Sequence, residues 1–157
     1  MKKNIDILRM VLISPELCFL LAVFLVYQLW PDLLSFAGQP FKEKGDVWKY
    51  LPTLPILFTG VVFKSGEKIR SPLDNAKNKI LYEWPLYNYL RDRVLFSFFI
   101  CIFCSISAIS LWIFIDSLNS SIVGAIYICA TGISGLTALC IILALPSLKE
   151  ILCKYTK

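Results

Sequence analysis

Residues 121–145 read SIVGAIYICATGISGLTALCIILAL and contain no charged side chain. A helix needs about 20 apolar residues to cross the hydrocarbon core of a bilayer, so this stretch is long enough to be a transmembrane helix. The stretches 10–30 and 94–116 are similar, each with a single acidic residue. Over the whole chain 57% of residues are apolar and 17% are charged, whereas soluble domains average about 25% charged residues. The sequence predicts an all-α integral membrane protein, folded as one domain over residues 1–157.

A fourth stretch, 47–63, is a weaker candidate because Pro52, Pro55 and Gly60 interrupt it. The distribution of cations decides whether it crosses, since Lys and Arg are retained in cytoplasmic loops. If it does not cross, ten cations from Lys42 to Arg93 lie outside. If it crosses, three cations near the N-terminus, seven in segment 64–93 and three near the C-terminus lie inside, which is thirteen of the 16. We therefore expect four spans, about 10–30, 47–63, 94–116 and 121–145, with both termini cytoplasmic.

The run Ser14-Pro15-Glu16 is typical of a helix start, with Ser as N-cap, Pro at the first helical position and an acid in the first turn. In one register residues 4–13 then form a separate interfacial helix. In the other a single helix runs to Trp30 with a kink at Pro15. We expect a kinked or broken helix, because 17–30 alone is too short to span. The first span lacks a small-x-small cleavage site, so it does not read as a cleaved signal peptide.

Small residues recur in the last span at Ala130, Ser134 and Ala138. Such rows let helix backbones approach closely in lipid. Because only about five residues around Asp116 and Asn119 separate the last two spans, these spans are expected to form an antiparallel hairpin with a tight outer turn. The small row then packs inside the hairpin, and we predict that it also forms an oligomer interface between copies of the chain.

Glu16 is the only acid well inside an apolar run, and an ionisable group at membrane depth is a functional candidate. It lies one or two turns from the cytoplasmic face, where it acts either as a helix-start acid or as a partner of Arg9. Span two supplies hydroxyls at Thr59 and Thr53 beside its prolines, which predicts a helix buried against protein. The alternative is that span two lines a solute or ion pathway.

Catalytic and metal chemistry are poorly represented. The chain has no His, which removes the commonest general base and metal ligand. A CxxC pair, Cys101 and Cys104, places two sulfurs on one helix face, but it lies near mid-membrane without a second pair, and a structural role fits better. The six cysteines do not resemble the disulfide framework of a secreted domain. We expect no enzyme activity, no cofactor and no metal site.

Segment 64–93 is the longest expected cytoplasmic loop and carries seven cations against four acids. It is too short for a catalytic domain, and its net charge is a weak footprint for nucleic acid, so direct nucleic-acid binding is not expected. The simplest reading is a loop that sets topology and touches anionic lipid. The functional reading is a surface for a cytoplasmic protein partner, formed by Lys77, Lys79, Tyr82, Trp84, Arg91 and Arg93.

Within 72–93 the run Ile80-Leu81-Tyr82-Glu83-Trp84-Pro85 looks like a family-specific juxtamembrane motif. In size and architecture the whole chain resembles the small four-span membrane subunits of bacterial two-gene antiphage systems, such as the Kiwa membrane component. That resemblance implies an inner-membrane oligomer that senses infection or membrane disturbance and recruits a cytoplasmic effector. Small immunity proteins against pore-forming bacteriocins look similar in the same general way. No functional residue is carried over from either group.

These observations favour a non-enzymatic inner-membrane sensor or scaffold that oligomerises and docks a cytoplasmic partner through segment 64–93. The alternatives are a bacteriocin-immunity protein and a small channel or transporter with span two lining the pathway.

Overall fold

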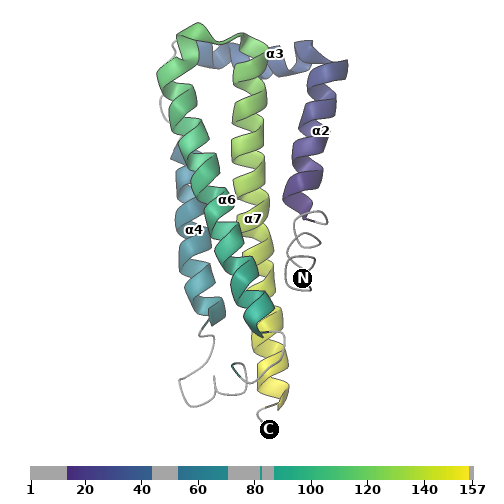
Figure 1. The fold of residues 1–157 in the computed structure, drawn as a ribbon, viewed down its shortest axis with the longest axis vertical. Coiled ribbons are helices and arrows are strands. Elements are labelled where there is room, and N and C mark those ends of the chain that lie inside the picture. Colours follow the sequence, from purple (N-terminus) through teal and green to yellow (C-terminus); the bar gives the residue numbers. More distant parts are fainter. Residues whose placement is uncertain (1–13, 44–52, 71–81, 83–86, 156–157) are drawn as a thin grey trace, which may run out of the picture.

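The computed structural model describes residues 14–43, 53–70, 82 and 87–155. Within these ranges the regular elements are all helical, which confirms the predicted all-α class. They are, in order, α2 (Pro15–Leu29), α3 (Pro31–Lys42), α4 (Thr53–Arg70), α6 (Tyr87–Phe114), the short 3₁₀ helix η2 (Ile115–Ser117) and α7 (Ser120–Tyr155). Figure 1 shows α2, α4, α6 and α7 running lengthwise, with α3 lying across one end of the bundle.

Two helical stretches, Tyr87–Ser117 and Ser120–Glu150, are long and apolar enough to cross a membrane. The pair α2 and α3 meets the same criterion only when taken together, and the two helices are bent by 101°. The described residues therefore contain two candidate spans, or three if the bent pair counts as one broken span. This composition indicates a membrane protein.

The predicted helix start at Ser14 is confirmed. Its backbone is extended and its Oγ accepts a hydrogen bond from the backbone N–H of Leu17 at 3.2 Å. α2 then runs for 15 residues, which is about 22 Å at the usual rise per residue. Residues 1–13, including the expected interfacial helix, lie outside the described residues. The chain leaves the helix at Trp30, where φ is −138° and ψ is 68°.

A helix replaces the expected outer loop after Trp30. α3 begins at Pro31 and buries Leu34, Gly38 and Phe41 along one face. These residues are four and three apart, which is the spacing of a helical stripe. The signal was present in the sequence, but the stretch is too short and too polar to be read as a span.

α3 and α7 cross with their backbones in contact. A Cβ atom added at Gly38 would collide with the carbonyl of Ser120, and one added at Gly124 would collide with the carbonyl of Leu34. Only glycine permits this approach, because any side chain would separate the two helices. The crossing fixes α3 across the end of the bundle.

The second predicted span, 47–63, overlaps helix α4, which is not among the candidate membrane spans of the described residues. α4 continues seven residues beyond 63, to Arg70, because Gly66 and Ile69 remain buried in the packed interface. A Cβ at Gly66 would lie 2.9 Å from a methyl group of Val94, so α4 and α6 approach closely at this point. The first part of the predicted span, 47–52, lies outside the described residues. Residues 64–70 and 87–93 of the predicted cytoplasmic loop 64–93 belong to α4 and α6.

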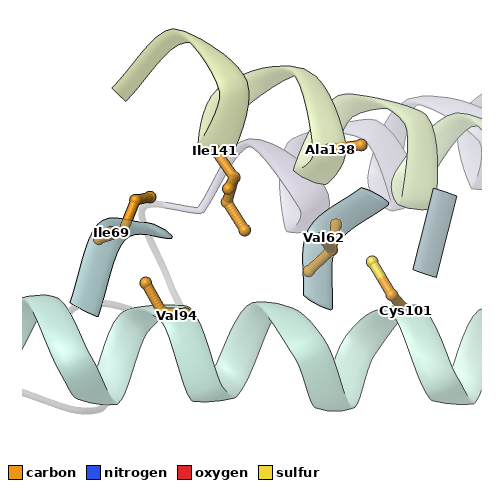
Figure 2. Packing of buried hydrophobic residues seen from close by; sticks show 6 residues of the cluster. All are labelled: Val62, Ile69, Val94, Cys101, Ala138 and Ile141. Atoms are coloured by element: carbon orange, nitrogen blue, oxygen red, sulfur yellow. The ribbon is translucent and has the colours of Figure 1, made fainter. Parts of the chain in front are cut away.

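α7 contacts every other long helix of the described chain. The ring of Phe19 in α2 lies over Gly132, and the ring of Phe58 in α4 lies over Gly135. At the end away from α3, side chains from α4, α6 and α7 interlock in the core shown in Figure 2. Its buried members are Val62, Ile69, Val94, Cys101, Ala138 and Ile141.

The expected hairpin between the last two long helices is present. α6 ends at Phe114, η2 follows, and α7 begins at Ser120. The backbone carbonyl of Asn119 accepts a hydrogen bond from the N–H of Val123 at 3.0 Å, which closes the first turn of α7. Asp116 and Asn119 therefore lie in a short turn, as predicted from the sequence.

Candidate functional site

Glu16 forms a buried ion pair with Arg93. One guanidinium nitrogen of Arg93, Nη2, donates to both carboxylate oxygens of Glu16 at 2.9 Å each. Glu16 follows the N-cap of α2, whereas Arg93 lies in the second turn of α6. The side chain of Glu16 is 5% exposed and that of Arg93 is 27% exposed. Opposite charges at membrane depth are expected to pair in this way, since an isolated charge there is costly.

A third helix contributes to the same cluster. The hydroxyl of Thr137 in α7 lies 3.3 Å from Oε1 of Glu16 and 2.8 Å from the backbone carbonyl of Ile133. A hydroxyl has one hydrogen, so it donates to one of these acceptors at a time. The cluster thus joins α2, α6 and α7 through polar groups surrounded by apolar packing.

Arg93 has a second neighbour on its own helix. The guanidinium carbon lies 5.9 Å from the ring centroid of Phe96, within the range of a cation–π contact. Its other terminal nitrogen, Nη1, is buried and has no hydrogen-bond partner among the described residues. Arg93 is therefore held by Glu16 and Phe96, and its side chain is only partly exposed.

From the sequence, Glu16 was predicted to be a candidate functional residue with Arg9 as a possible partner. Arg93 was predicted to lie on the docking surface. Arg9 lies outside the described residues, and the partner found is Arg93, 77 positions away in the chain. A signal was available, because the acid and the cation both lie at the cytoplasmic ends of predicted spans. Their pairing depends on which helices are neighbours, and a single sequence does not report that.

A groove of about 560 Å³ lies beside the ion pair, between α2 and α6 and over α7. Ser14 and Glu16 line one end of it. Apolar residues line the rest: Leu17 and Leu20 from α2, Phe96, Phe99 and Phe103 from α6, and Ile126, Cys129 and Ile133 from α7, among others.

A separate hydroxyl cluster joins α4 to α6. The Oγ1 atom of Thr59 lies 2.8 Å from the carbonyl of Pro55, 3.1 Å from the carbonyl of Cys101 and 2.8 Å from Oγ of Ser105. The hydroxyl expected beside the prolines is therefore used between helices. Leu57, on the opposite face of α4, is exposed.

The predicted oligomer row is occupied within the chain. Ala130, Ser134 and Ala138 are all buried, and Ser134 donates its hydroxyl to the carbonyl of Ala130 at 2.7 Å. Ala130 packs with Cys104 of α6, while Ala138 belongs to the core of Figure 2. Within one chain these residues pack the helices together, so an oligomer interface would need other surfaces.

The predicted docking residues are only partly described. Lys77, Lys79 and Trp84 lie outside the described residues. Tyr82 is exposed, and its ring meets that of Tyr87 edge to face with centroids 5.2 Å apart. Arg91 is 41% exposed at its side chain and pairs with the adjacent Asp92 at 3.1 Å.

The CxxC sulfurs lie in the packed interior. Cys101 and Cys104 are buried and free, and they belong to two different apolar clusters. Among the described residues no group of three or more His, Cys, Asp or Glu side chains is arranged to hold a metal ion.

No family model, curated protein or solved structure matches this chain. The functional argument therefore rests on the ion pair, the groove and the exposed cations.

Proposed function

We propose that this chain is a non-enzymatic sensor or scaffold of a bacterial inner membrane, with both termini in the cytoplasm, that docks a cytoplasmic partner through segment 64–93. The observation that carries the proposal is the Glu16–Arg93 ion pair. Arg93 is the last residue of the segment, and Glu16 lies in the first turn of α2. A displacement of α2 within the membrane is thereby transmitted to the start of α6.

The charges at this end of the bundle support docking. Lys64, Lys68 and Arg70 on α4 are exposed, and Arg91 is partly exposed. The end of α4 and the start of α6 lie at the same end of the bundle, opposite α3 (Figure 1). A cationic surface of this kind is complementary to an acidic protein surface and speeds its association.

The contacts of α4 favour a role in packing the helix bundle over a role in lining a solute or ion pathway. The hydroxyl of Thr59 is engaged by backbone carbonyls and by Ser105, which leaves it in a packed contact between helices. Selective pathways need polar groups that face a pore. We also propose that the protein forms homo-oligomers and serves in antiphage defence, as its resemblance to the Kiwa membrane component implies.

Docking is tested by crosslinking in cells with a photoreactive amino acid placed at Lys68. The variant carries Lys64→Glu and Arg91→Glu, and the matched control carries Lys42→Glu at the opposite end of the bundle. We expect one discrete crosslinked partner in the wild type and in the control, and its loss in the double reversal. A partner band that survives the double reversal would show that docking does not use this surface.

Sensing is tested in the same assay with Arg93→Met, which breaks the ion pair beneath the surface. We expect the yield of the crosslinked partner to change although position 68 keeps its charged neighbours. An unchanged yield would leave docking intact and contradict coupling through the ion pair.

A further inference from the structure

α3 lies across the end of the bundle where α6 and α7 turn (Figure 1), and it contacts η2 and α7 there. It is bent by 101° from α2. A helix of 12 residues is about 18 Å long, and at this angle it changes position along the axis of α2 by only about 3 Å. α3 therefore stays at one level along the bundle rather than continuing the course of α2.

Contacts with α7 fix that level. The backbone of Gly38 lies against the carbonyl of Ser120, the first residue of α7. The ring of Phe41 meets the ring of Tyr127 with centroids 4.5 Å apart. From Ser120 to Tyr127 is about 10 Å along the helix axis at 1.5 Å per residue. α3 thus lies beside the first two turns of α7.

The turn between α6 and α7 shows where these helices leave the hydrocarbon. Both helices have the length and composition of membrane spans, and the turn between them carries Asp116 and Asn119. Polar and charged side chains at such a turn lie outside the hydrocarbon, because burying them there is costly. α3 lies within about 10 Å of this turn, and interfacial helices bury their apolar face about 5–10 Å into the boundary between headgroups and acyl chains.

The side chains of residues 31–43 are separated by polarity around the helix. At 100° per residue, the apolar residues fall within one continuous arc of about 220°, and the polar residues fall within a separate arc of about 100°. The stripe packed inside the protein, Leu34, Gly38 and Phe41, occupies only part of the apolar arc. The remainder of that arc is exposed and consists of Leu33, Phe36 and Pro40.

This exposed apolar arc continues a surface that begins on α2. Leu33 and Phe36 are 58% and 79% exposed, and Leu29 and Trp30 at the end of α2 are 64% and 62% exposed. Tryptophan is enriched at membrane–water interfaces, since its ring is apolar and its N–H is polar. A flat boundary between hydrocarbon and water favours one apolar arc and one polar arc on a helix that lies along it.

We propose that α3 is an interfacial helix that binds the surface of the phospholipid bilayer. Leu33, Phe36 and Pro40 lie among the upper parts of the acyl chains, while Asp32 and Gln39 on the polar arc face water. The contact of Gly38 and Gly124 with the opposing backbone prevents α3 from rolling about its axis. The proposal depends neither on the docking of a cytoplasmic partner nor on which side of the membrane is cytoplasmic.

The first test measures thiol reactivity in the full-length protein, reconstituted into vesicles of phosphatidylcholine and phosphatidylglycerol. Phe36→Cys is compared with Gln39→Cys, and a charged maleimide is present on both sides of the bilayer. Mass spectrometry of the labelled peptides separates the new thiol from the native cysteines. Because only the thiolate reacts and it does not form in hydrocarbon, we expect position 39 to react at least about tenfold faster than position 36. Equal rates, whether fast or slow, would overturn the proposal.

The second test identifies what covers the apolar arc. The same two variants are labelled with bimane in detergent and reconstituted with phospholipid brominated in the upper half of one acyl chain. The wild type, labelled in the same way, gives the background from native cysteines. We expect stronger quenching at position 36 than at position 39. A thiol at position 36 that is protected from maleimide but not quenched would show that protein, such as a second copy, covers the arc, and would refute binding to lipid.

Both tests need folded variants, so helix content and gel-filtration profile are compared with those of the wild type. Leu33→Cys repeats the measurements at a second position of the exposed apolar arc. A folded Leu33→Cys variant that reacts as fast as Gln39→Cys would contradict the proposal independently of position 36.

Discussion

Breaking the Glu16–Arg93 pair from each side should destabilise the bundle unequally. Arg93→Met leaves the carboxylate of Glu16, 5% exposed, without its cation. Glu16→Met leaves the guanidinium of Arg93, which is 27% exposed and carried on a long stem. A long cationic side chain moves its head toward the interface more easily than a carboxylate on a short side chain does.

The expected magnitudes follow from this difference. Removing the partner of a buried charge lowers the free energy of unfolding by about 3–5 kcal/mol, which is the range expected for Arg93→Met. Glu16→Met is expected to cost about 1.5–3 kcal/mol, the value of a charged hydrogen bond, because Arg93 finds water. The double variant, with two apolar side chains in place of the pair, should lie within about 2 kcal/mol of the wild type.

The assay is equilibrium unfolding in mixed micelles, followed by the loss of helical circular dichroism as the fraction of denaturing detergent rises. The double-mutant cycle should give a coupling energy of at least about 2 kcal/mol. Thr137→Val serves as a control, since it removes the hydroxyl that lies 3.3 Å from Oε1 of Glu16 and 2.8 Å from the carbonyl of Ile133 but leaves both charges of the ion pair in place. Additive losses in the free energy of unfolding for the two single variants, or a larger loss in Glu16→Met than in Arg93→Met, would refute this account of the ion pair.

Two further predictions concern packing. Gly124→Ala places a methyl group against the backbone of α3 and should lower the free energy of unfolding by about 1–3 kcal/mol. In Gly60→Ala the new Cβ meets nothing within 4 Å, so this variant should raise the free energy of unfolding by about 0.5–1 kcal/mol. Equal effects in thermal unfolding would contradict the backbone contact. Thr59→Val removes the hydroxyl shared between α4 and α6 and should lower the free energy of unfolding by about 0.6–1.7 kcal/mol. The hydroxyl of Ser107 bonds only within its own helix, so Ser107→Ala should change the free energy of unfolding by less than about 0.5 kcal/mol. A larger loss in the serine variant would show that the inter-helix hydroxyl is not the relevant one.

Local signals in the sequence were sufficient to predict several structural elements. The N-cap at Ser14 and the turn at Asp116 depend on a few neighbouring residues, and both appear where expected. Hydrophobicity falls after Phe63, so the apolar pattern gave no sign that α4 continues to Arg70, where the buried Gly66 and Ile69 hold its last turns in place. α3 was missed because its apolar stripe is short and its stability comes from the contact with α7.

Part of the candidate site could likewise be predicted from the sequence, and part could not. Glu16 stood out because a carboxylate inside an apolar run is rare. The groove had no sequence signal, since Leu, Phe and Ile line it just as they line any packed interface. Ala130, Ser134 and Ala138 were expected to pack inside the hairpin, and the structure buries all three within the chain.

The sequence by itself determined that the chain is helical, apolar and suited to a membrane, because uncharged runs such as 121–145 satisfy their backbone polar groups only as helices in lipid. It also determined where a helix begins at Ser14 and where the last two helices turn. Only the tertiary structure decided that Glu16 meets Arg93, that α3 lies across the bundle, and that α2 and α6 stand apart to leave a groove. These features depend on contacts between residues far apart in the chain, and such contacts are set by which helix faces fit together rather than by any local pattern.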